Sequence, residues 1–111
     1  MIVSSILGSS LLGAAALMAV QPDPTRAPRD AFTRCLFAYV DKAAQDRTSR
    51  PDFDTQFAQQ CQNEEQSFRT AIRASAGRIP AAEVEEIQKM EVEDSRLNAK
   101  ARFEDATTPR A

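Results

Sequence analysis

The residues of this sequence with the most obvious covalent chemistry are its only two cysteines, Cys35 and Cys61. They lack the C-x-x-C spacing and the neighbouring base that a redox-active pair needs. We therefore predict a structural disulfide between them, with two small buried thiols as the alternative. In the chain-entropy description, closing a loop of roughly 27 residues stabilises the folded state by about 3.5 kcal/mol. That is a large contribution for so short a domain.

The carboxylates closest in sequence to Cys61 are Glu64 and Glu65. Neighbouring residues of a helix point about 100° apart, so these side chains do not face each other as a catalytic pair would. We predict that they lie on a solvated edge. Asp52 and Asp54 have the spacing that opens a calcium-binding loop, but the glycine and the final acid of such a loop are missing. We therefore predict no metal ion and no cofactor.

Other catalytic groups are scarce. The chain has no histidine, which removes the commonest general base and the commonest metal ligand. Its serines have no histidine partner, and no glycine-rich phosphate loop is present. The formal net charge is −2 and the basic residues are spread along the chain, whereas nucleic-acid-binding proteins usually have a strongly basic face. We predict a protein that is not an enzyme and binds no nucleic acid.

Residues 1–20 form an apolar segment without a charged side chain. Such a segment is typical of a cleaved secretory signal peptide, and Ala14–Ala16 and Ala19 supply small residues for cleavage. An uncleaved membrane anchor is the main alternative, because the segment is just long enough to cross a bilayer and its small residues recur every four positions. A buried soluble helix is the third interpretation. Either of the first two predicts a periplasmic or secreted domain.

Proline positions and apolar periodicity divide the rest of the chain into three predicted helices. Three prolines make residues 21–28 a stiff spacer. Apolar residues then recur with a period of about 3.6 in three segments, and each of the later prolines stands at a boundary. The predicted helices are Asp30–Asp46, Asp52–Ala76 and Ala81–Asp105, with Asp30 as the N-cap of the first or as an acid in its first turn.

The turn at Arg47–Pro51 folds the first two helices into a hairpin with Cys35 opposite Cys61. In the third helix the apolar stripe includes Met90 and Leu97, which we expect to face the hairpin. The predicted fold is all-α: a small antiparallel three-helix bundle, made of the disulfide-linked hairpin and a third long helix, preceded by an N-terminal apolar helix. The expected organisation is a signal peptide or anchor (1–20), a proline-rich spacer (21–28), a helical domain (29–106) and a disordered tail (107–111).

These features favour a small exported protein that binds an unidentified protein of the cell envelope. Phe37 and Val92 are apolar residues off the predicted stripes, so we expect them to contact that partner. The alternative is a membrane-anchored structural protein, in which residues 1–20 are retained and the third helix mediates self-association. Contact with a membrane is expected only through residues 1–20.

Overall fold

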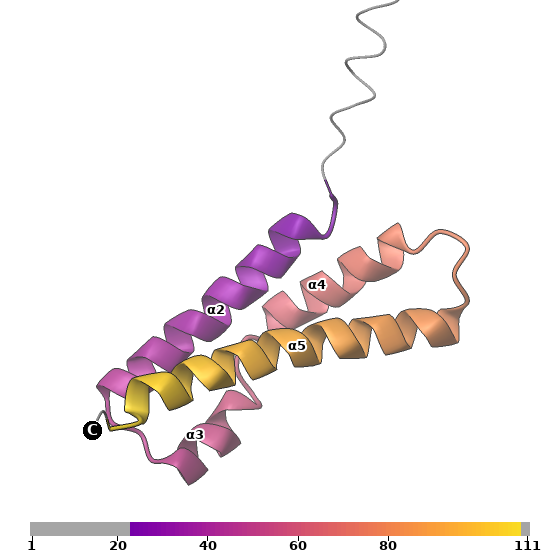
Figure 1. Cartoon of the computed structure of the whole chain (residues 1–111). Coiled ribbons are helices and arrows are strands. Elements are labelled where there is room, and N and C mark those ends of the chain that lie inside the picture. Colours follow the sequence, from indigo (N-terminus) through magenta and orange to yellow (C-terminus); the bar gives the residue numbers. More distant parts are fainter. Residues whose placement is uncertain (1–22, 110–111) are drawn as a thin grey trace, which may run out of the picture.

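The computed structural model describes residues 23–109, which are helical and contain no strand (Figure 1). The helices of this part of the chain are α2 (Arg26–Gln45), α3 (Arg50–Phe57), α4 (Gln62–Ser75) and α5 (Ala81–Thr107). The prediction of an all-α protein is thereby confirmed. The signal peptide or anchor predicted at residues 1–20 lies outside the described residues. Among the helices that are described, none is both long enough and apolar enough to span a bilayer.

The first helix begins earlier than predicted, at Arg26 rather than near Asp30. Thr25 precedes it, and the Asp23 carboxylate accepts hydrogen bonds from the backbone N–H and the hydroxyl of Thr25, at 2.9 and 2.8 Å. Pro28 fits in the first turn because the amide groups there have no acceptor within the helix. The predicted proline-rich spacer therefore ends at Thr25, three residues before its expected boundary at residue 28.

The predicted second helix is in fact two helices, α3 and α4, separated by residues 58–61. Ser49 caps α3 as its type suggests, since its hydroxyl accepts a hydrogen bond from the N–H of Asp52 at 3.3 Å. At the break, Cys61 has a left-handed backbone with φ of 62°. That conformation costs a residue with a Cβ atom about 1–2 kcal/mol, so the break needs tertiary contacts to hold it.

The buried face of α5 differs from the predicted one. Met90 and Leu97, which we expected to face the hairpin, are 55% and 63% exposed. The face that packs consists of Val84, Gln88, Val92, Ala99 and Phe103. Gln88 can be buried because its side-chain amide donates a hydrogen bond to the carbonyl of Arg69 on α4, at 2.8 Å. Apolar residues stand on both sides of α5, so their periodicity alone indicated the wrong face.

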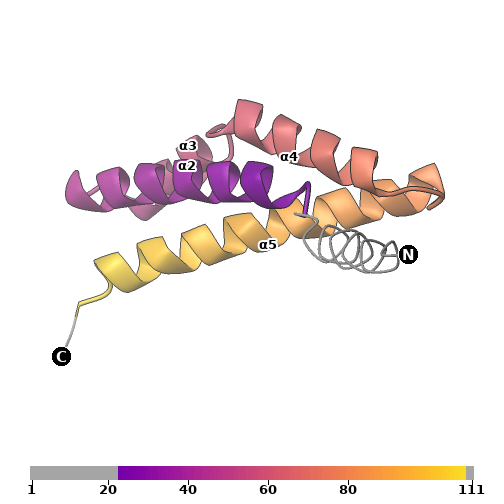
Figure 2. The same ribbon diagram turned by 90° about the horizontal axis from the view of Figure 1, so that it is seen from above.

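Phenylalanine side chains join the helices in a common core. Phe53 of α3 stacks on Phe103 of α5 with ring centroids 3.8 Å apart. Phe32 of α2 lies 6.1 Å from Phe68 of α4, also between centroids. Helices α2 and α5 run in the same direction and α4 runs opposite to both (Figure 1), while Figure 2 shows α5 extending along both of them. This packing brings the start of α4 beside Cys35 on α2.

Candidate functional site

The break between α3 and α4 is where the residues with candidate chemistry meet. Cys35 lies on α2 and Cys61 is the residue just before α4. The two form a disulfide with their Cα atoms 5.9 Å apart, and both residues are partly buried. The predicted pairing is confirmed, and no free cysteine remains in residues 23–109.

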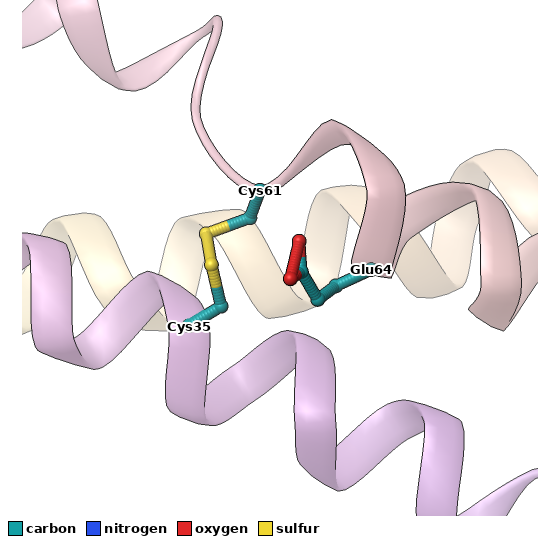
Figure 3. A group of neighbouring side chains, drawn as sticks. All are labelled: Cys35, Cys61 and Glu64. Atoms are coloured by element: carbon teal, nitrogen blue, oxygen red, sulfur yellow. A yellow bond between two sulfur atoms is a disulfide. The ribbon is translucent and has the colours of Figure 1, made fainter.

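Glu64, in the first turn of α4, points toward this disulfide (Figure 3). Its carboxylate and the sulfur atoms of Cys35 and Cys61 all lie within 4.8 Å of one another. Two thiolates and a carboxylate are zinc ligands in many proteins, but here the sulfurs are bonded to each other and are not thiolates. What remains is a negative charge beside a disulfide. That charge opposes both the approach of a thiolate and the departure of one during thiol–disulfide exchange.

We expect Glu64→Gln to accelerate reduction of the disulfide by glutathione roughly two- to fivefold, because a charge at this distance contributes about 0.5–1 kcal/mol in water. The rate is followed by acid quenching, alkylation and mass spectrometry. Glutathione approaches as an anion, whereas cysteamine carries an ammonium group and should gain no advantage from the substitution. Glu86→Gln removes an exposed carboxylate from α5 and serves as the control. Equal glutathione rates for Glu64→Gln and the wild type would show that Glu64 does not protect the bond.

Glu65 is held in a hydrogen-bonded cluster and is not on a solvated edge as predicted. Its carboxylate accepts hydrogen bonds from Arg96 of α5, at 2.8 and 3.2 Å, and from Arg69 of α4, at 3.1 Å. The Arg96 guanidinium also donates to the backbone carbonyls of Phe57 and Gln60, at 3.0 and 2.9 Å. Because the helix is interrupted here, these carbonyls lack the amide donors four residues on that a continuous helix would supply, and Phe57 keeps only a turn hydrogen bond from the N–H of Gln60, at 3.1 Å. Arg96 therefore replaces those donors and stabilises the break.

The charge of Glu65 makes the stability of the domain depend on pH. Burial raises the pKa of this carboxyl, but the hydrogen bonds from Arg96 and Arg69 outweigh burial and hold the pKa below its ordinary value of 4.5. The folded state thus binds this proton more weakly than the unfolded chain does. The stabilisation is complete above about pH 5 and is lost as the pH falls through the lowered pKa.

We accordingly expect Glu65→Gln to unfold at a lower urea concentration than the wild type at about pH 7, and the difference to shrink at about pH 3. Urea unfolding followed by circular dichroism at the two pH values measures it. Asp105→Asn removes an exposed carboxylate of α5 that has no ion pair among residues 23–109, and it should change neither curve. An equal loss of stability at both pH values in Glu65→Gln would contradict a role for the ionised carboxylate.

The two predicted partner contacts, Phe37 and Val92, lie in different environments. Phe37 on α2 is partly buried, and the guanidinium of Arg102 lies over its ring, 4.7 Å from the centroid. Arg102 also binds the Asp41 carboxylate with hydrogen bonds of 2.8 and 3.0 Å. Val92 is only 4% exposed and belongs to the core. The surface position predicted for Val92 is wrong, because the packed face of α5 is rotated away from the predicted stripe.

The large hydrophobic side chains that are exposed in residues 23–109 are Ile79, Met90 and Leu97. Leu97 borders a shallow groove of about 340 Å³ between α3 and α5, and Phe57 and Ala58 contribute its other apolar wall. Sequence reasoning assigned Met90 and Leu97 to the core and so missed this surface. The signal that could have found it is the pair of acids at Glu93 and Asp94, which stand between the two apolar residues.

Comparison with known proteins gives no relative: no protein family, no curated protein and no solved structure matches this chain. The function must therefore be inferred from the residues themselves. Among them, Cys35, Cys61 and Glu65 serve the fold, while Met90 and Leu97 have no role in the core that would explain their types.

Proposed function

We propose that this chain is a small exported helical module that binds another protein in the cell envelope and catalyses no reaction. The observation that carries the proposal is the exposure of Met90 and Leu97 on α5, a helix whose opposite face packs in the core. Exposure of apolar side chains to water is unfavourable, and a partner that covers them removes this cost. The proposed contact surface is therefore the outer side of α5, in place of Phe37 and Val92.

Export is supported by the disulfide together with the apolar segment at residues 1–20. Disulfides persist in oxidising compartments and are rare in the cytosol. In this proposal the segment directs the chain across the membrane, and the helical domain folds on the far side. The Cys35–Cys61 bond then fixes α4 against α2, in a small bundle where α2, α4 and α5 alternate in direction.

The absence of catalysis is supported by how the reactive side chains are engaged. The sequence contains no histidine, and both cysteines are in the disulfide. Glu65 is neutralised by two arginines, which lowers its pKa and makes it a poor general base near neutral pH. The Thr25 hydroxyl donates to the Asp23 carboxylate at the start of α2, whereas the other serine and threonine hydroxyls that donate hydrogen bonds within residues 23–109 bind backbone carbonyls and not a base.

The proposal is tested by placing a photo-crosslinking amino acid at position 97 in the full chain and irradiating its native host. We expect one discrete adduct that contains a second, different protein. The same amino acid at Ala74, an exposed position of α4, is the control and should give no such adduct. An adduct of two copies of the chain would instead favour a self-associating protein. Absence of any adduct at position 97 would overturn the proposal.

A further inference from the structure

The outer face of α5 is defined by the residues that point directly away from the core. Successive residues of a helix are rotated by about 100°, so positions 90, 97 and 101 lie on one line along α5. That line is opposite Ala99 and Gln88, which are buried. The face therefore consists of exposed residues that flank this line: Glu83, Glu86, Met90, Glu93, Asp94, Leu97, Ala101 and Asp105.

The apolar part of the outer face continues into the groove beside α3. Leu97 forms one wall of the groove and Phe57 and Ala58 form the other. Lys100 and Asp54 also line the groove and form an ion pair, with Nζ and Oδ1 3.3 Å apart. The groove has a volume of about 340 Å³, which is large enough for one or two apolar side chains of a partner.

The polar part of the outer face carries one sign of charge. Its five acids make no ion pair or side-chain hydrogen bond within residues 23–109: Glu83, Glu86, Glu93, Asp94 and Asp105. The neighbouring bases stand at its margin, and Lys100 is already paired with Asp54. A partner that covers this face must therefore bring positive charge to it.

We propose that the outer face of α5 binds a basic amphipathic helix of another protein. Apolar side chains of that helix would cover Met90 and Leu97 and enter the groove, and its Lys or Arg residues would face the five carboxylates. Helices bind in grooves through apolar anchors spaced about three, four and seven residues apart. Anchors seven residues apart on a partner helix lying along α5 would be separated by the same rise as Met90 and Leu97. This inference rests on the proposed function and adds the chemistry of the partner.

A second copy of the chain fits this face less well. If two copies of α5 pair antiparallel with Met90 against Leu97, the same register places Glu93 of each copy against Asp94 of the other. Like charges directly across an interface oppose association. In a parallel pair each carboxylate would face its own equivalent. The charge of the outer face thus favours a basic partner over self-association.

The probe is a synthetic helical peptide of about 14 residues made of leucine and lysine, with leucines along one side. A peptide with the same leucine positions and glutamate in place of lysine is its matched control. The experiment uses the oxidised protein with the N-terminus that it has when isolated from its native host. Binding is followed by fluorescence anisotropy of the peptide and by backbone amide chemical shifts of the protein. We expect micromolar affinity for the lysine peptide, as is typical of a small interface, with shifts centred on α5.

Two sets of variants separate the apolar contribution from the charge. The double variant Met90→Ala, Leu97→Ala should weaken binding at least about tenfold, because it removes both exposed apolar side chains. The triple variant Glu86→Gln, Glu93→Gln, Asp94→Asn should weaken binding about fivefold and reduce its dependence on salt. Ile79→Ala removes an exposed hydrophobic residue that precedes α5, and it should have no effect.

Equal affinity for the lysine and glutamate peptides would overturn the inference that the outer face of α5 binds a basic helix. Changes in amide chemical shift centred on a helix other than α5 would overturn it as well. The result is separable from the proposed function. If the crosslink at position 97 captures another protein whose bound segment is not basic, the proposed function holds and the inference fails. If position 97 captures nothing, the proposed function itself fails.

Discussion

Replacing Cys35 and Cys61 together by serine is expected to lower the free energy of unfolding by about 3.5 kcal/mol, the value for a closed loop of this length. The bond joins residues 26 positions apart and fixes the start of α4 against the middle of α2. Without it, the left-handed conformation at Cys61 must be held by other contacts. Because small domains have only about 5–15 kcal/mol of net stability, this loss removes a large fraction of it, and we expect the variant to have a markedly lower unfolding temperature.

Urea unfolding of the oxidised protein, the reduced protein and the serine variant measures this contribution. The reduced protein and the serine variant should unfold at the same urea concentration, well below that of the oxidised protein, because both lack the covalent constraint. Circular dichroism before denaturant shows whether helix is already lost. A difference of less than about 1 kcal/mol between the oxidised and reduced proteins would show that the disulfide does not determine the stability of this fold.

Replacing Arg96 by methionine is expected to cost about 3 kcal/mol, because one substitution removes four hydrogen bonds from three partly buried acceptors. Those acceptors are the Glu65 carboxylate and the carbonyls of Phe57 and Gln60. The Arg96 side chain is 18% exposed and Glu65 is 23% exposed, so water replaces these hydrogen bonds poorly. The guanidinium also lies 5.4 Å from the ring centroids of Phe32 and Phe57.

Arg102→Met is the matched control for Arg96→Met. Arg102 is also on α5, also binds a carboxylate and also stacks on a phenylalanine, but its side chain is 47% exposed. Exposed ion pairs contribute about 0–1 kcal/mol, so its loss should be small. The double variant of Arg96→Met with Glu65→Gln should be less destabilised than the sum of the two single variants, by at least about 1 kcal/mol. Equal losses in Arg96→Met and Arg102→Met would show that Arg96 has no special role.

The disulfide could be predicted because it depends on features local to the sequence. A turn between two apolar stripes places Cys35 level with Cys61, and the predicted export of the chain favoured an oxidised pair. The break after Phe57 could not be predicted in this way. The segment 58–61 contains neither glycine nor proline to mark a break. The interruption is stabilised by Arg96, which lies more than thirty residues farther along the chain.

The face of α5 shows the other limit of sequence reasoning. An apolar stripe through Met90 and Leu97 looked like the core side because residues there are large and aliphatic. The actual core side includes Gln88, which finds a hydrogen bond on α4, and Ala99, whose small side chain leaves room for close packing. Such compensation depends on neighbouring helices, which periodicity does not represent. The same error placed Val92 on the surface.

The most direct test of a disulfide-linked, exported domain is the intact mass of the protein isolated from its native host, with alkylation under non-reducing conditions. We predict the mass of a chain that begins near residues 17–21 and carries no alkyl group. A signal peptidase would cleave after the apolar segment, and Cys35 bonded to Cys61 leaves no thiol to alkylate. A full-length mass without alkylation would indicate a retained anchor on the same linked domain. Two alkylated cysteines in the isolated protein would contradict the disulfide, and with it the oxidising location on which the proposed function depends.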